Sequence, residues 1–248
     1  MVQGRIGAQH RARQGRTRQL TRSAVDMDLI DALRGTGSVR AFTDEPVDDS
    51  VLARVLDIAR FAPSGGNRQP WRVAVVKDPE LRRRLADAMT PVWDEYAAIS
   101  ATGITPFSSA PPAPYELESK RPGNVPNQLL TEIATIPVVL AVAADLTRIA
   151  MMDKDLDRSP ITGGASVYPF CWNVLLAARS EGLGGVITTF ASRAENVTGP
   201  LLGLPEHHAL AATIFLGHPV KQPTRLKRHS VDDFATVDRF DGAAFPHR

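Results

Sequence analysis

The segment that most constrains the fold is IPVVLAVAA, residues 136–144, in which no side chain carries a charge or a hydrogen-bonding group. Such a run predicts a strand buried inside the protein. Shorter apolar segments at 71–76, 185–190 and 210–216 predict three more strands, and helix-patterned segments lie between them. Strands separated by helices in one chain of this length predict a single α+β domain with three layers, α/β/α.

The helix-patterned segments carry signals for their ends, because capping oxygens, prolines and glycines mark helix termini. We expect helices at 25–33, 49–62, 78–89 and 166–181. The end signals are a cap at Asp48 or Asp49, a stop at Pro63, a cap at Asp78 with Pro79 behind it, a terminating Gly182, and a capping box, SRAE, at 192–195 that opens a short helix.

Composition excludes several classes of protein. The only cysteine, Cys171, rules out a disulfide within the chain, so a reducing cytoplasm is the expected location. The sequence has no apolar run long enough to cross a membrane. Residues 1–23 contain six arginines and no acidic residue, and we expect a disordered tail there. A nucleic-acid-binding arm is the alternative, but the tail has no aromatic residues and the rest of the chain is acidic, so no nucleic-acid partner is expected.

Two further segments depart from the domain pattern. Residues 91–128 lose their periodicity in the second half and are rich in proline, which predicts a lid or binding insertion. Residues 218–248 form a C-terminal arm with no core of its own. Such an arm is expected to lie on a partner subunit, so the domain at 24–248 is expected to dimerise.

The loop between Pro63 and Pro70, with the sequence PSGGNRQP, contains residue types that suit a ligand-binding site. Gly65 and Gly66 permit a flat ligand to approach the backbone closely. Asn67 and Gln69 each offer a donor and an acceptor, which complements the edge of a heterocycle. The alternative is a turn whose amides bond its own backbone, and the loop alone does not decide between the two.

Other segments carry chemistry that is weak by itself. Ser38 and Arg40 follow a glycine-opened turn, GLGGVITTF enters a strand through glycines, and PTRLKRHS holds Arg225, Lys227 and Arg228. Hydroxyl and guanidinium groups suit a phosphate. Dinucleotide, P-loop and GxSxG motifs are absent, the histidines lack the spacing of metal ligands, and Cys171 lies on an apolar helix face. No metal site is expected.

Taken together and in order, SVRAF, ARFAPSGGNRQPWRVAVV, LLAARSEGLGG and IFLGHP with the basic tail resemble the FMN-dependent nitroreductase family. The resemblance runs from about Asp28 to Phe234, and its most specific part is the loop. It implies a nitroreductase-like fold with a central, mostly antiparallel sheet flanked by helices. It also implies an intertwined homodimer in which both chains contribute residues to each FMN site.

The resemblance carries over residue by residue. Two basic residues often precede the serine in the family; Thr36 and Gly37 stand here, and Arg34 is a possible substitute. The positions implied to bind FMN are Ser38 and Arg40 at the phosphate and pyrimidine side, Pro63, Ser64, Asn67 and Gln69 around the isoalloxazine, Ile187, Thr188 and Thr189 beside the ring, and Arg228 with Lys227 or Arg225 at the phosphate.

The implied activity is NAD(P)H-dependent reduction of a nitroaromatic or quinone by ping-pong kinetics, since the cofactor performs the redox chemistry and the protein orients it. No catalytic side chain is assigned. Arg40 or Arg68 is expected to stabilise the reduced flavin, and the basic residues favour NADPH over NADH. Planar substrates are expected to stack on aromatic side chains; the candidate substrate residues are Arg68, Trp93, Tyr96, Phe107 and Tyr115. The alternative for Trp93 and Tyr96 is a place in the core.

Two other functions remain open from the sequence. One is a different FMN reaction on the same scaffold: flavin fragmentation, dehalogenation or dehydrogenation. The other is a flavin-binding protein without enzymatic activity.

Overall fold

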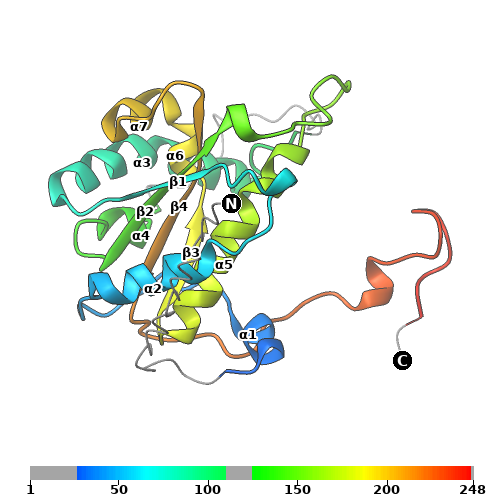
Figure 1. The fold of residues 1–248 in the computed structure, drawn as a ribbon, viewed down its shortest axis with the longest axis horizontal. Coiled ribbons are helices and arrows are strands. Elements are labelled where there is room, and N and C mark those ends of the chain that lie inside the picture. The colour runs from blue at the N-terminus through cyan, green and yellow to red at the C-terminus, as the bar shows by residue number, and fades with distance from the viewer. Residues whose placement is uncertain (1–26, 110–124, 247–248) are drawn as a thin grey trace, which may run out of the picture.

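The computed structural model describes residues 27–109 and 125–246. Its centre is a four-stranded antiparallel sheet in the order β1-β2-β4-β3 (Figure 1). The strands are β1 (Trp71–Val75), β2 (Val138–Asp145), β3 (Gly184–Thr188) and β4 (His208–Gly217). The expected strand at 136–144 is therefore confirmed as β2, which lies in the interior of the sheet and is buried along its whole length.

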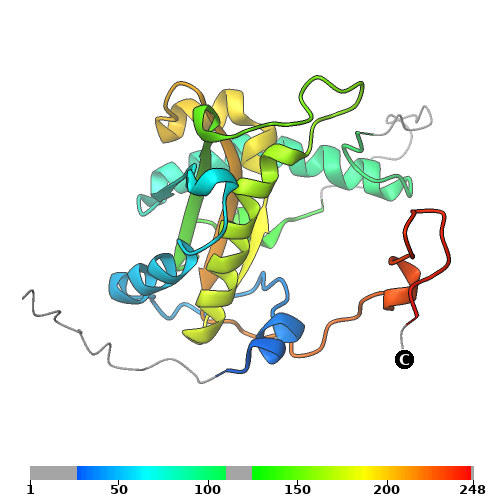
Figure 2. The same ribbon diagram turned by 45° about the vertical axis from the view of Figure 1, so that its right-hand side comes forward.

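Helices cover both faces of the sheet, which confirms the three-layer expectation (Figures 1 and 2). Successive side chains of a strand point to opposite faces. In β2, Leu140 and Val142 pack with α2 (Asp49–Ala59) and α5 (Tyr168–Ser180). Val139 and Ala141 pack on the other face with α3 (Pro79–Ala101). The elements that complete this second layer are α4 (Gln128–Thr131), α6 (Phe190–Arg193) and α7 (Glu195–Leu202).

The helix ends follow the sequence signals in part. Asp78 caps α3 through the N–H of Glu80, and Pro79 is the first helical residue. Gly182 follows α5 with φ 79°, a left-handed conformation in which the glycine terminates the helix. Asp48 holds the N-cap position of α2, but its carboxylate makes no capping hydrogen bond.

Several boundary expectations were wrong. The helix expected at 25–33 runs from Leu29 to Gly35, and the helix expected at 49–62 ends at Ala59. The strand expected at 185–190 runs from Gly184 to Thr188, and Phe190 already belongs to α6. The capping box at 192–195 does not form, because Ser192 lies inside α6 with its hydroxyl buried. Glu195 starts α7, and its carboxylate accepts a hydrogen bond from the N–H of Leu210 in β4. This tertiary contact replaces the local cap.

The segment expected to be a lid begins as a helix. Residues 91–101 continue α3 through Pro91, because Val92, Ala98 and Ile99 are buried and hold the helix against the protein. The proline-rich residues 110–124 lie outside the described residues, so a lid there remains a prediction. The Arg-rich tail at 1–23 also lies outside them.

Residues 218–246 leave the body of the protein. The segment first pairs with the turn before α2, where the N–H of Val220 donates to Ala41 O. Residues 222–228 then stay against α1 and the start of β3, and after them the arm extends away from the domain (Figures 1 and 2). Phe234, Phe240 and Phe245 on it are exposed by half or more, so the arm has apolar surface that this chain does not cover.

One buried carboxylate, that of Asp153, holds the segment between β2 and α5 in its conformation. It accepts hydrogen bonds from the N–H groups of Ile161 and Thr162 and from the Thr162 hydroxyl, and it pairs with Arg158 at 2.7 Å. These donors stabilise the charged carboxylate, the Thr162 hydroxyl most strongly, and hold the pKa of Asp153 well below its ordinary value.

A depressed pKa makes this stabilisation sensitive to acid. Because the folded pKa lies below the unfolded value of about 3.9, the contribution is complete at neutral pH and is lost as the pH falls below about 4. We expect D153N to lower the free energy of unfolding in urea at pH 7, and the gap from wild type to shrink at pH 3. D155N, which changes an exposed carboxylate of the same segment, is the control. An equal gap at both pH values would contradict this assignment.

Candidate functional site

The Pro63–Pro70 loop has an unusual backbone. After the end of α2 it makes a short 3-10 turn at Gly65–Asn67. Gly66, Asn67 and Gln69 have φ values of 60°, 52° and 48°, all in the left-handed region. Glycine reaches this region freely and asparagine tolerates it, whereas glutamine does so at a cost. Conformations of this kind persist where the surrounding structure enforces them, and they gather at ligand sites.

The amides of the loop are only partly used within it. Gln69 Nε2 donates to Asn67 Oδ1 at 3.1 Å, and the Gln69 N–H donates to Ser64 Oγ at 2.9 Å. No described residue bonds Gln69 Oε1 or Asn67 Nδ2, and both side chains are exposed. One acceptor and one donor are therefore presented outward. The Arg68 guanidinium instead folds back to Gly65 O at 3.2 Å.

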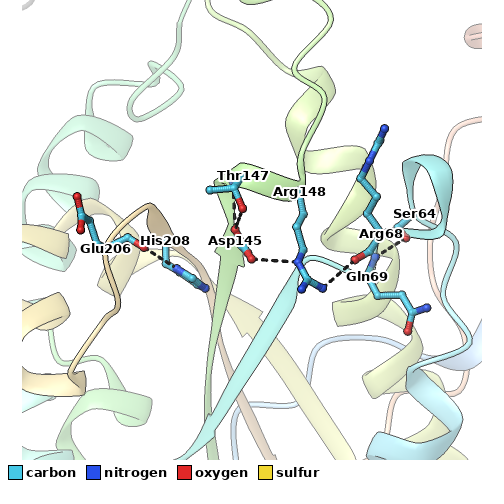
Figure 3. A network of polar contacts seen from close by, with 8 residues as sticks. All are labelled: Ser64, Arg68, Gln69, Asp145, Thr147, Arg148, Glu206 and His208. Carbon is cyan, nitrogen blue, oxygen red and sulfur yellow. Dashed lines mark hydrogen bonds and ion pairs between the residues drawn. The ribbon is translucent and has the colours of Figure 1, made fainter.

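A polar network lies beside this loop, at the end of β2 (Figure 3). Asp145 accepts hydrogen bonds from the Thr147 hydroxyl and N–H and pairs with Arg148 at 3.2 Å. The Thr147 hydroxyl contributes most to lowering the pKa of Asp145, with further contributions from His208 and Arg148. Arg148 Nη1 in turn donates to Arg68 O at 3.4 Å. The sequence analysis did not identify Asp145 or Arg148.

Ser38 and the end of β3 share one edge of the sheet. Ser38 forms a parallel bridge with Gly185, and the Val39 N–H donates to Gly185 O at 2.9 Å. The backbone of Gly185 thus faces outward, and in an antiparallel strand the second residue along faces the same side. The N–H and C=O of Ile187 therefore point to the outer edge of β3, where no described residue pairs with them. The Thr188 hydroxyl donates to Thr213 O of the neighbouring strand β4, and Thr189 follows as the residue before α6.

The basic residues gather around a cavity of about 900 Å³ between α1 (Leu29–Gly35), the end of α5 and residues 224–228. Arg34, Arg225 and Arg228 line it, whereas Lys227 does not, and neither Ser38 nor Arg40 does. Arg179, from the last turn of α5, also lines it, and its Nε is buried without a hydrogen-bond partner. Four arginines exceed the two acidic residues of the lining, so the cavity suits an anion.

Arg179 was missed by the sequence analysis. Its only signal was a position directly before SEGLGG, at the end of an amphipathic helix. Thr36 directly follows Gly35, which lines this cavity. The Thr36 hydroxyl is buried and likewise has no hydrogen-bond partner among the described residues.

The loop lies at one end of α5, and α1, which lines the basic cavity, lies at the other (Figure 2). The Gly65 N–H donates to Ser166 Oγ, just before the helix starts. The cavity includes Arg179, one residue before the helix ends. A helix of 13 residues is about 20 Å long. Within one chain, the structure therefore does not bring the loop together with the basic cavity.

Three of the predicted substrate residues, Trp93, Tyr96 and Phe107, form an aromatic cluster that adjoins the end of β3. Trp93 and Tyr96 stack at 5.8 Å between ring centroids, and Tyr96 contacts Phe107 at 6.3 Å. Phe190 meets Trp93 and Tyr96 edge-on, a contact that the sequence analysis missed because it placed Phe190 in a strand. Tyr96 and Phe107 are more than a third exposed, so they are not core positions, whereas Trp93 is partly buried against the core. Tyr115 lies outside the described residues.

Other chemistries find little support. No cluster of potential metal ligands occurs within residues 27–109 and 125–246. Cys171 is fully buried, and this burial raises the pKa of its thiol to about 12, so it is not a nucleophile. Among the same residues, no helix has the length and apolarity needed to span a membrane.

Comparison with known proteins agrees with this fold. A model of the nitroreductase family matches residues 33–218. A putative NADH dehydrogenase/NAD(P)H nitroreductase of Archaeoglobus fulgidus is 26% identical over 206 residues, 82% of this chain and 88% of the relative. A 5,6-dimethylbenzimidazole synthase of Rhodobacter capsulatus is 29% identical over 192 residues, 77% of this chain and 83% of the relative.

Solved structures share the fold. The NADPH:FMN oxidoreductase of Vibrio harveyi, complexed with NAD⁺, superposes with a TM-score of 0.60 at 22% identity, covering 86% of this chain and 77% of that one. An iodotyrosine deiodinase bound to FMN and 3-iodo-L-tyrosine gives 0.59 at 21% identity, covering 86% and 100%. The family match spans most of the chain, including the loop, β3 and the aromatic cluster. The chain belongs to the nitroreductase family.

Proposed function

We propose that this protein is an FMN-dependent oxidoreductase that uses NAD(P)H to reduce a nitroaromatic or quinone-type substrate. The observation that carries the proposal is the Pro63–Pro70 loop. Its left-handed backbone at Asn67 and Gln69 presents one amide donor and one amide acceptor to the outside. This is the complement of a flavin's heterocyclic edge.

The residues present suit FMN at both of its ends. The arginines around the cavity, with the unpartnered Nε of Arg179, would hold the phosphate. The outward N–H and C=O of Ile187, with Thr188 and Thr189 beside them, would line the ring.

The separation of loop and cavity supports a dimer with shared sites. One chain offers the ring-binding loop at one end of α5 and the phosphate-binding cations at the other. A two-fold dimer can set the loop of one chain against the cavity and β3 edge of its partner. The two-fold axis repeats this contact, so the dimer contains two equivalent sites. The C-terminal arm, with Phe234 and Phe240 exposed, is suited to hold such a pair together.

The protein's own contribution to the reaction is binding and orientation. When bound, FMN would supply a carrier that accepts a hydride from NAD(P)H and passes the electrons to a second substrate. Tyr96 and Phe107 offer exposed rings on which a planar substrate can stack beside the end of β3. Arg40, which has no ion pair with a described residue, would stabilise negative charge on the reduced ring better than Arg68, whose guanidinium is bonded to its own loop.

The same scaffold supports a second candidate. The relatives named a dimethylbenzimidazole synthase and a deiodinase show that this family contains other reactions. Flavin fragmentation or dehalogenation would use the same FMN-binding residues, but the bound flavin would undergo a different reaction.

Anaerobic spectroscopy of the purified protein with FMN separates these functions. We expect a flavin absorbance band that bleaches when NADPH is added, because the nicotinamide can stack on the exposed face and donate its hydride. A nitroaromatic or quinone should then restore the band. A bound flavin that neither NADPH nor NADH bleaches would contradict the reductase and favour the second candidate. Absence of FMN binding would contradict both.

The basic cavity predicts how affinity depends on the phosphate. We expect R34Q and R179Q each to weaken FMN binding about tenfold, since a charge-assisted hydrogen bond to phosphate contributes about 1.4 kcal/mol or more. Binding of riboflavin, which has no phosphate, should not change. Flavin fluorescence quenching measures both, with R83Q on α3 as the control. Equal losses for the two flavins would show that the cavity does not hold the phosphate.

The arm predicts the oligomeric state. We expect the full chain to be a dimer by light scattering and a chain ending at residue 229 to be a monomer, because truncation removes the exposed phenylalanines of the arm. Deletion of residues 1–23 should leave the dimer intact. A monomeric full chain would rule out the shared site.

A further inference from the structure

One peptide group of the loop, between Arg68 and Gln69, is held from both sides (Figure 3). Its N–H donates to Ser64 Oγ at 2.9 Å, from within the loop. Its carbonyl accepts from Arg148 Nη1 at 3.4 Å, from outside the loop. The plane of this peptide sets the φ of Gln69, which is 48°. Because a non-glycine residue avoids this region, the two bonds stabilise a conformation that the chain would otherwise leave.

Asp145 orients the guanidinium group of Arg148. Residues Leu146–Arg148 form a 3-10 turn, in which side chains three apart in sequence lie above one another. The Thr147 hydroxyl and N–H occupy Asp145 Oδ1, which leaves Oδ2 to Arg148 Nε at 3.2 Å. The planar guanidinium can thus bond Asp145 with one nitrogen and Arg68 O with another, a fork that lysine lacks.

The same aspartate also fixes the end of the loop. The Asp145 N–H donates to Pro70 O at 2.8 Å, where β2 meets the residue before β1. Its side chain is nearly buried, with 11% exposed, so the anchor belongs to the rigid sheet. The loop is therefore attached to the end of β2 at two points, through the Asp145 backbone and through Arg148.

We propose that Arg148, oriented by Asp145, is a positioning residue for the flavin: it fixes the Arg68–Gln69 peptide and thereby the direction of the Gln69 amide toward the ring. This inference rests on the proposed FMN function. Arg148 need not touch the flavin, because it acts through the peptide that precedes Gln69. Without it, the loop gains conformations in which the amide no longer meets the heterocyclic edge.

The chain supplies a matched control. Arg158 pairs with the buried Asp153 at 2.7 Å and is 48% exposed, close to the 50% of Arg148. Its hydrogen bonds go to Asp153 and Ser159, in the segment between β2 and α5, and none goes to the Pro63–Pro70 loop. R148A and R158A therefore remove the same kind of ion pair, and only R148A frees the Arg68–Gln69 peptide.

The test measures FMN affinity by fluorescence quenching, the visible spectrum of the bound flavin, and the melting temperature of the apoprotein. We expect R148A to weaken FMN binding about tenfold, the effect of one hydrogen bond to a charged group, and to shift the flavin spectrum. R158A should change neither. R148K should bind with intermediate affinity, because one ammonium group replaces the fork. Amide exchange in the apoprotein should be faster at Gln69 in R148A only.

The outcomes separate this inference from the function on which it rests. Wild-type affinity and spectrum in R148A would overturn the positioning role while leaving FMN binding in place. Equal effects of R148A and R158A on affinity would also overturn it, because they would reflect general loss of stability. A wild-type protein that binds no FMN would overturn the proposed function itself.

Discussion

The burial of β2 on both faces is the constraint on which the rest of the structure depends. An eight-residue strand with no exposed position needs apolar partners above and below, so the chain has to supply two helical layers. One layer contains α5, and the other contains α3 and α6. The Pro63–Pro70 loop joins α2 of the first layer to β1, and the aromatic cluster extends from the second. Both candidate binding elements are thus placed by the same central strand.

The sequence predicted most of the architecture because the core has simple periodicity. The apolar run at 136–144, the stripe of α5 and the glycine after it all correspond to local rules of burial and capping. Local rules failed where tertiary contacts took over. Residues 91–101 stay helical despite Pro91 because the next turns are buried, and Glu195 bonds β4 in place of capping its own helix. A sequence alone does not show which partner a polar side chain finds.

The candidate site was predictable in its parts and not in its arrangement. The loop motif, Ser38 and the basic tail carry signals in their residue types. Arg148 has no such signal and Arg179 has only its position before SEGLGG, since each is one arginine among many and gains its place only through the fold. The distance between loop and cavity along α5 is also invisible in the sequence. This distance is the physical argument for the proposed two-chain site.

The burial of Cys171 has a consequence for how this molecule can be studied. Since the chain's only thiol is inaccessible and held in its protonated form, a cysteine introduced at the surface would be the single reactive one. A spin label or fluorophore could then be attached at one chosen point per chain. In an assembly of two chains, each label would report the separation between identical positions directly, without prior removal of a native cysteine.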